Sequence, residues 1–530
     1  MRNDPGTGRR RALAFLGWGA AILSSAALPM EGVAFAQSGG GGVPAALRSA
    51  AGSDRDLNAF YRARSHRPVW VRGGALVPEA ERLAHHIADA ALDGLDPADY
   101  RAAALLAAVE DARDGNAAAL ARAEAALSRA FASYVRDLHK PSDVGVIYVD
   151  RELKPRQPTR KELLDALGAA TSLSALLDHK LTVNRHYAEL RAAYADWRAR
   201  WGDLPDVRVP TGPTLSSGAT GERVRLLRQR LGLAPGNRFD GDVAQKLRAW
   251  KVAHGLPREP VADAATIAAL NRGQVHHERL IRANLERARA LPSDLGRRYV
   301  LVDAAAARLW LYEDGRPVDS MRVVVGKKSD QTPMMAAFIR HVTFSPYWNV
   351  PPDLVERRIA PNVLSQGLSY LRNARYEVFS SWEDDAVRVD PTTVDWAAVA
   401  SGRKELPVRQ LPGRGNAMGD MKFMLPNQHG IYLHDTPDRN LFGQDDRLQS
   451  SGCVRVEDAR KLARWLFGRN VRASGEPEQN VPLPEPVPVY ITYLTVAPAE
   501  NGALAFRSDV YDRDRVLLAR LGGGPSEGAR

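Results

Sequence analysis

The 530-residue sequence predicts a multidomain α+β protein with three folded parts. These are a mostly helical N-terminal scaffold, a small three-helix module, and a β-rich C-terminal domain that carries an inserted helical cap. Apolar residues recur at helical spacing in the first part, a Pro-, Gly- and Ser-rich stretch follows, and a strand-like period begins after residue 298. The length also exceeds what a single hydrophobic core usually holds.

The N-terminus has the composition of a secretory signal, which we assign to residues 1–36. Three arginines at positions 9–11 precede an apolar run, and a small-x-small cleavage site ends at Ala36. Glycines inside the run favour cleavage over a permanent membrane span, while the paired arginines leave twin-arginine export open. Membrane contact is therefore expected only through an uncleaved signal. Residues 37–56 are rich in Gly, Ser and Ala, and are expected to form a flexible leader.

The chain is basic, with a formal net charge of +11. Removing residues 1–36 takes away four arginines and two acidic residues, so about +9 remains. A basic exported protein suits a polyanionic wall or a membrane surface, although solubility and an arginine-rich composition explain the charge equally well. The export signal and the absence of a nucleic-acid-binding motif disfavour nucleic acid as a partner.

Residues 57–201 have the pattern of a helical scaffold domain. One helix is indicated between Pro78 and Leu92, and it stops at an Asp-Gly turn. A second helix is indicated by apolar residues spaced by 7, 4, 3 and 4: Leu120, Leu127, Phe131, Tyr134 and Leu138. No convergent catalytic set is found here.

Residues 202–220 contain several Pro, Gly and Ser residues and are expected to be a linker. Residues 221–272 then predict a compact unit of three helices with one Asp-Gly turn, at Asp240-Gly241. This order resembles the three-helix peptidoglycan-binding module of many wall enzymes. A plain spacer is the alternative.

A β-rich domain is expected over residues 298–495, followed by a C-terminal extension over 496–530. Its first strands are indicated at 299–303, 308–312, 321–326 and 338–344. Residues 353–412 interrupt the strand pattern and begin with a helix. This insertion is expected to cap a site as a lid, or to serve a purely structural purpose.

The candidate catalytic residues lie in one short stretch of this domain. Cys453 is the sole cysteine of the chain, so it is either a buried bystander or a reactive thiol. A thiol becomes a strong nucleophile only when a base removes its proton, and His434 ends an alternating strand-like run 19 residues upstream. The small residues before Cys453 allow a close backbone approach, and the N–H groups of Gly452 and Cys453 are candidate donors to an oxyanion.

This text resembles the catalytic motif of the L,D-transpeptidases, in which a histidine precedes a Ser-x-Gly-Cys segment by about 15 to 20 residues. The resemblance extends to three earlier segments: Val323–Lys327, Thr332-Pro333 and Phe344–Pro351. Together with the scaffold, the module and the cap, it covers roughly residues 57–515. It is closest to the large periplasmic subfamily, so a periplasmic location is expected.

The resemblance implies a reaction on peptidoglycan stem peptides. Cys453 attacks the carbonyl of the third residue of a tetrapeptide stem, D-alanine leaves, and the amine of a second stem resolves the thioester into a 3→3 cross-link. His434 acts as the base and is oriented by the backbone carbonyl of Asp435. Tyr432 is a candidate donor to the oxyanion. The expected biological role is cell-wall organisation and cell shape, and carbapenems are expected to acylate the thiol.

Other positions have less certain roles. Arg455 stands where shorter family members often carry Asn, and large members also carry Arg. It is expected to bind a substrate carboxylate, or to pair with Glu457 or Asp458. Trp348 is expected to line the cleft or to be buried, and Ser451 to orient the site or simply to be small.

Several alternatives stay open. Water as the acceptor makes the protein an L,D-carboxypeptidase or another hydrolase, and an envelope protein as acceptor makes it an attachment enzyme. A wall-binding scaffold without activity is the non-enzymatic alternative. No cofactor and no metal are expected, because neither His-x-His nor His-Glu-x-x-His occurs. Other wall synthases or envelope proteins remain open as partners.

Overall fold

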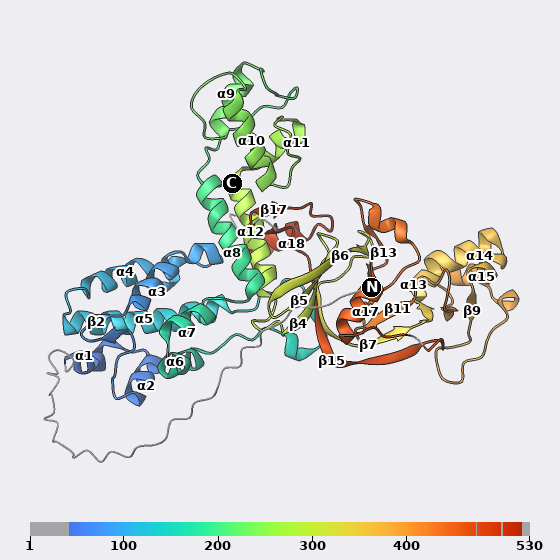
Figure 1. Ribbon diagram of the computed structural model, residues 1–530, viewed down its shortest axis with the longest axis horizontal. Helices are drawn as coiled ribbons and strands as arrows, with labels where there is room; N and C mark the ends of the chain where they lie inside the picture. Colours follow the sequence, from blue (N-terminus) through green and yellow to red (C-terminus); the bar gives the residue numbers. More distant parts are fainter. Residues whose placement is uncertain (1–41, 473, 500–501, 522–530) are drawn as a thin grey trace, which may run out of the picture.

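The computed structural model describes residues 42–472, 474–499 and 502–521. The expected signal, residues 1–36, and the first residues of the expected leader lie outside these ranges. The protein is a multidomain α+β molecule in which the scaffold helices, the small helical module and the cap project from a central sheet (Figure 1). In these ranges no helix combines the length and the apolar content needed to cross a membrane.

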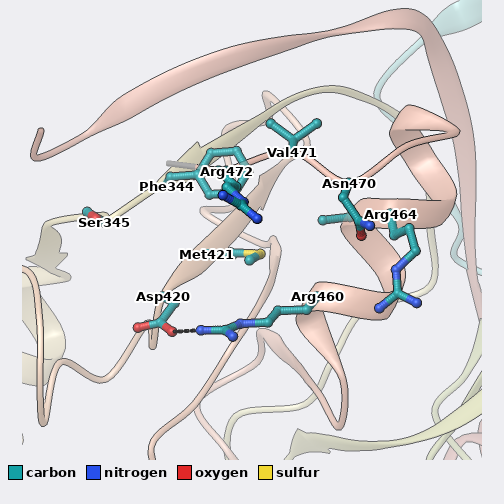
Figure 2. Close-up of a pocket in the computed structure, with 10 residues that line it drawn as sticks. Phe344, Ser345, Asp420, Met421, Arg460, Arg464, Asn470, Val471 and Arg472 are labelled. Carbon is teal, nitrogen blue, oxygen red and sulfur yellow. Dashed lines mark hydrogen bonds and ion pairs between the residues drawn. The ribbon is translucent and has the colours of Figure 1, made fainter. Parts of the chain in front are cut away.

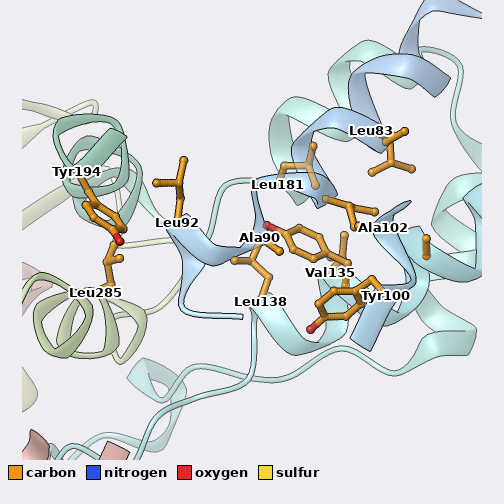
Figure 3. Close-up of a cluster of buried hydrophobic side chains, with 14 of the residues drawn as sticks. Leu83, Ala90, Leu92, Tyr100, Ala102, Val135, Leu138, Leu181, Tyr194 and Leu285 are labelled. Carbon is orange, nitrogen blue, oxygen red and sulfur yellow. The ribbon is translucent and has the colours of Figure 1, made fainter. Parts of the chain in front are cut away.

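The scaffold is built around the long helix α5 (Ala117–Leu138). The side chain of Asn116 caps its N-terminus, and the apolar face that the spacing predicted is buried against the other helices. Figure 3 shows part of this core. The neighbouring helices are α2 (Arg55–Ala63), α3 (Pro78–Ala88), α4 (Ala102–Asp111), α6 (Arg160–Ala169), α7 (Leu173–Lys180) and α8 (Arg185–Trp197). A short hairpin of β1 (Val71–Arg72) and β2 (Ala75–Leu76) joins α2 to α3.

Part of the expected flexible leader is a helix instead. Helix α1 (Gly42–Ala50) buries Val43 and Leu47, and it packs along α5. Composition suggested flexibility because the segment is rich in small residues. Two apolar residues four positions apart are nevertheless enough to anchor one helical turn on an existing core.

The helices of the small module are α9 (Glu222–Arg230), α10 (Gly241–Ala253) and α11 (Ala264–Asn271), and α12 (Gly273–Arg289) leads from them to the sheet. An aromatic stack attaches the module to Phe506, which lies in the C-terminal segment. The centroid of the His254 ring lies 4.0 Å from the centroid of the Trp250 ring and 5.1 Å from that of Phe506. Gly255 follows with φ +69°, and a Cβ there would lie 1.9 Å from the Phe506 carbonyl oxygen. Only glycine permits this close contact with the C-terminal hairpin.

The sheet of the C-terminal domain closes on itself. Its strand order is β11-β12-β14-β6-β5-β4-β15-β7, and β11 also pairs with β7. An apolar core fills the ring. The strands are β4 (Arg298–Asp303), β5 (Arg308–Glu313), β6 (Arg316–Gly326), β7 (Met335–Phe344), β11 (Met421–Met424), β12 (Leu433–His434), β13 (Leu448–Ser450), β14 (Val454–Val456) and β15 (Gln479–Thr492).

Segments from both ends of the chain complete this domain. From the scaffold side, β3 (Ile147–Tyr148) pairs in parallel with β7. From the C-terminal side, the hairpin of β16 (Val496–Pro498) and β17 (Leu504–Phe506) leads to α18 (Arg513–Leu521), which packs on α12. A buried ion pair of 2.6 Å joins Arg287 to Asp514, and the Tyr511 hydroxyl donates to the Gly326 carbonyl. The C-terminal segment is therefore integral to the fold.

The cap (residues 353–412) has its own small apolar core. It is helical as expected, and it also carries a three-stranded sheet that begins just before it: β8 (Trp348–Val350), β10 (Val408–Gln410) and β9 (Tyr376–Val378). Its helices are α13 (Pro352–Leu354), α14 (Ala360–Gln366), α15 (Ser369–Asn373) and α16 (Trp396–Ala400). The cap extends from the end of the closed sheet where β11 lies (Figure 1).

Candidate active site

His434 and Cys453 lie on neighbouring strands of the closed sheet. Strands β12 and β14 are parallel, and His434 pairs in register with Arg455. Cys453 immediately precedes β14, and the N–H of the next residue, Val454, donates to the Tyr432 carbonyl. Both side chains line one cavity of about 420 Å³, together with residues of the cap. Strand pairing thus brings together two residues that are 19 positions apart in the sequence.

The His434 ring is held in one tautomer. It is 2% exposed, and its Nδ1 lies 2.6 Å from the backbone oxygen of Asp435. Because a carbonyl only accepts, we assign the proton to Nδ1, which leaves Nε2 as an acceptor. Burial, together with the nearby charges of Arg455 and Lys422, lowers the pKa of His434 to about 3, while the hydrogen bond to Asp435 acts in the opposite direction. The imidazole is therefore neutral near pH 7 and available as a base.

The thiol of Cys453 is protonated at rest. Its Sγ lies 3.3 Å from the Gly430 carbonyl, to which it donates. Burial raises the pKa of Cys453 to about 11. Hydrogen bonds from the N–H and the hydroxyl of Tyr432 act in the opposite direction, as do the charges of Lys422 and Arg455. These four groups favour the thiolate, so they become most useful when sulfur loses its proton.

The candidate oxyanion donors differ in availability. Gly452 has φ +110°, a conformation that favours glycine, and its N–H donates to the Ser450 hydroxyl at 3.2 Å. That bond departs from our expectation that the Gly452 N–H faces an oxyanion. Within the described chain, the Cys453 N–H makes no hydrogen bond and is free to donate, whereas the Tyr432 hydroxyl already faces the Cys453 sulfur. Ser451 is exposed and lines the cavity.

The Asp435 side chain faces away from the histidine ring. Its carboxylate accepts from the backbone N–H of Asp420 at 2.9 Å and from the Arg439 guanidinium. It is buried, and it holds the end of β12 against the end of β11. The carbonyl of Asp435 is thus the group that contacts His434, while its carboxylate stabilises the surrounding backbone.

Trp348 and Arg455 both line the cavity. Trp348 is 5% exposed and belongs to the apolar core of the cap. The alternative partners expected for Arg455 are engaged elsewhere, because Glu457 pairs with Arg322 and Asp458 caps α17 (Ala459–Phe467). Arg455 instead lies 3.5 Å from the exposed carboxylate of Asp438.

Two cationic residues of this site were missed by sequence reasoning. Lys422 on β11 lies opposite His434 in register, and its ammonium is 4.9 Å from the centre of the Tyr432 ring. Burial lowers its pKa, and the charges of Glu478 and Cys453 raise it. Arg358 enters the same cavity from the cap. Neither residue belongs to the sequence motif that contains His434 and Cys453, and no local motif of their own marks them.

A second cavity of about 540 Å³ lies beside the end of β11, where Asp420 and Met421 line it. Figure 2 shows Asp420 and Arg460 facing each other across it, and their ion pair measures 3.3 Å. Neither a thiol nor an imidazole lines it, so it lacks the cysteine and histidine of the first cavity. In the described part of the chain, no group of three or more His, Cys, Asp or Glu residues is arranged to hold a metal ion.

Comparisons with known proteins assign two parts of the chain. A family model described as the L,D-transpeptidase catalytic domain matches residues 297–488, and one described as a scaffold domain matches residues 55–193. A Haemophilus influenzae protein named "Putative L,D-transpeptidase" is 32% identical over 242 residues, which is 44% of this chain and 48% of that protein. The chain thus matches about half the length of this relative.

Solved structures of low similarity were also found. An L,D-transpeptidase from Mycobacterium smegmatis is 12% identical, with a TM-score of 0.19, over 37% of this chain and 58% of that one. An L,D-transpeptidase from Xylanimonas cellulosilytica is 17% identical, with a TM-score of 0.16, over 53% of this chain and 98% of that one. At these scores the two structures add nothing to the assignment, which depends on the family models.

Proposed function

Because the chain belongs to the L,D-transpeptidase family through its catalytic and scaffold domains, we propose that it joins peptidoglycan stem peptides by 3→3 cross-links through a thioester on Cys453. The observation that supports this most is that a buried, neutral imidazole and the single thiol of the chain line the same cavity. The whole reaction is a transfer of one acyl group from one amine to another.

In the first half of the proposed reaction, the Cys453 thiol gives its proton to His434 Nε2 while Sγ attacks the carbonyl carbon of the third stem residue. The resulting oxyanion accepts hydrogen bonds from the Cys453 N–H and the Tyr432 hydroxyl. When the intermediate collapses, the carbon–nitrogen bond to the terminal D-alanine breaks. His434 returns the proton to the leaving amine, and a thioester remains.

In the second half, the side-chain amine of another stem attacks the thioester carbon. His434 accepts a proton from that amine, the carbon–sulfur bond breaks, and the sulfur recovers the proton as a thiol. The enzyme is regenerated, with one new amide bond formed and one D-alanine released. Because Asp435 fixes the Nδ1 proton through its backbone, Nε2 serves as acceptor and donor in both halves.

The remaining parts of the chain have proposed roles around this chemistry. Residues 1–36 act as an export signal that delivers the enzyme to the periplasm, with cleavage after Ala36. Residues 221–272 act as a peptidoglycan-binding module, which is supported by their three-helix order. The domain limits that we propose are those of the sequence analysis, except that the segment carrying Tyr511 and Leu517 joins the catalytic domain, because these two side chains contribute to its core.

The test uses the mature protein with disaccharide-tetrapeptide fragments, read by mass spectrometry, beside the Cys453→Ala variant. A cross-linked dimer that lacks one D-alanine, and that is absent with the variant, is the expected result. Loss of D-alanine without a dimer would replace the proposal by a hydrolase or by a different acceptor, such as an envelope protein. No reaction by a folded protein would favour a wall-binding scaffold.

A further inference from the structure

Two guanidinium groups share the catalytic cavity, and neither has a strong anionic partner there. Arg455 reaches it from β14, and Arg358 reaches it from the cap. Arg455 is largely buried, whereas Arg358 is exposed. A second positive charge beside a desolvated guanidinium is unfavourable unless an anion joins the two. The arrangement therefore calls for an explanation in terms of a ligand.

Arg455 is largely withdrawn from water and incompletely paired. Its side chain is 16% exposed, and its only carboxylate contact among the residues that the structure describes is with Asp438, at 3.5 Å, whose own side chain is 66% exposed. Its Nε is buried and has no hydrogen-bond partner. A buried donor left without a partner is costly, and an exposed ion pair compensates for little of that cost.

Arg358 is free because the neighbouring arginine takes the local carboxylates. Arg357 pairs with Asp330 at 3.0 Å and also with Asp353. Asp353 lines the same cavity, but its carboxylate is thereby engaged. Among the described residues, the Arg358 side chain has neither a hydrogen bond nor an ion pair. Its charge contributes to lowering the pKa of Arg455, so the two guanidinium groups are close enough to repel each other electrostatically.

The position of Arg455 relative to the sulfur limits which anion fits. Cys453 and Arg455 are two residues apart at the start of β14, and both line the cavity. Two residues of chain span at most about 7 Å. In a stem peptide bound for attack, the carboxylate of the leaving residue is three bonds from the attacked carbonyl carbon. A carboxylate held about 2.8 Å from a guanidinium spans the remaining separation.

We propose that Arg358 and Arg455 together form a receptor for the α-carboxylate of the residue that leaves. This inference rests on the proposed function, because it assumes that a stem peptide is attacked at Cys453. The receptor selects donors that end one residue beyond the scissile bond and carry a free carboxylate. Since one of its two groups belongs to the cap, binding of that carboxylate also ties the cap to the catalytic strands.

The experiment measures binding without chemistry. The full-length Cys453→Ala protein is titrated with a disaccharide-tetrapeptide and with the same fragment ending in D-alaninamide, by isothermal titration calorimetry. We expect the amide to bind about 10-fold or more weakly, because a charge-assisted pair is replaced by neutral contacts. Arg358→Gln and Arg455→Gln, each added to Cys453→Ala, are expected to weaken binding of the acid by a similar factor and to leave binding of the amide nearly unchanged.

Matched variants control for charge and folding. Arg403→Gln removes the same charge from an exposed position of the cap outside the cavity, and is expected to change neither affinity. Arg358→Lys keeps the charge and is expected to restore part of the acid's affinity. Thermal melting checks that each variant is folded. The inference fails if acid and amide bind equally well, or if Arg358→Gln weakens both ligands to the same extent.

The outcomes separate this inference from the proposed function. Selective binding of the acid that depends on both arginines, in a protein whose active form makes no dimer, would keep the receptor and remove the cross-linking role. Dimer formation by an enzyme that binds acid and amide alike would keep the function and remove the receptor.

Discussion

Replacing His434 by glutamine offers the sharpest test of the proposed chemistry. Burial holds the pKa of His434 near 3, so the ring is a free base throughout the range from pH 6 to 9. Burial also raises the pKa of Cys453 to about 11, which leaves about one thiol in ten thousand ionised at pH 7. Without a base, the reaction depends on that small thiolate fraction.

The expected magnitude follows from these two values. With His434 present, the rate at which Cys453 reacts should be nearly independent of pH between 6 and 9. In His434→Gln the rate at pH 7 should fall by ~10²–10⁴-fold, the usual contribution of a general base. It should then rise about tenfold for each pH unit, because the thiolate fraction does so below the pKa.

The assay is alkylation of the thiol by iodoacetamide, followed by intact-mass analysis. Cys453 is the only cysteine, so every adduct reports this site. His429→Gln is the matched control, because His429 is exposed and lines the same cavity. A His434→Gln rate within threefold of the wild type at pH 7 would refute the assigned role of His434. A steep pH slope in the wild type would refute it as well.

Further predictions concern the surroundings of the thiol and the fold. Lys422→Met should slow acylation of Cys453 about 10-fold, since one favourable charge near the thiolate is lost; the exposed Lys404→Met should not, and equal rates in stopped-flow acylation would exclude an electrostatic role for Lys422. A carbapenem should add its mass to Cys453 in the wild type and not in Cys453→Ala, and an active enzyme without an adduct would contradict the thiolate mechanism. Asp514→Ala should lower the free energy of unfolding by about 3–5 kcal/mol in urea titrations, because it leaves the buried Arg287 without its carboxylate; Asp512→Asn, which removes an exposed pair with Lys328 at a position of positive φ that asparagine tolerates, should leave it nearly unchanged. Burial raises the pKa of Glu124 in the folded scaffold to about 7, above its ordinary value of 4.5, so the folded state holds the proton more tightly. Its contribution to stability should therefore be present below pH 4.5 and decline as pH rises to about 7, and Glu124→Gln should remove that part of the pH dependence of the melting temperature.

Local sequence was sufficient wherever short-range rules apply. The alternation from Ile431 to His434, the small residues before Cys453 and the helical spacing in α5 each depend on neighbours along the chain. Those patterns predicted the change from helix to strand near residue 298 and the insertion that forms the cap, and they supplied the two residues that we propose for catalysis. They also predicted the α+β class, because the two hydrophobic periods differ and occupy separate parts of the chain.

Long-range pairing lay beyond those rules. The scaffold strand β3 joins the sheet at β7, and the C-terminal helix α18 docks on α12 through Arg287 and Asp514. Helix α1 formed where composition suggested flexibility, because Val43 and Leu47 found a core to join. Each case depends on a partner surface that is distant in sequence.

The amino-acid sequence alone was enough to propose which residues carry the chemistry, because a single cysteine and a nearby histidine in a recognisable motif need no fold to be identified. The tertiary structure decided the tautomer of His434, the pKa values of both residues and which other side chains lie near them. Lys422 and Arg358 come from separate segments, and they reach Cys453 only because the sheet closes and the cap lies beside it. Electrostatic fields and desolvation depend on distance in space, and distance along the chain does not predict them.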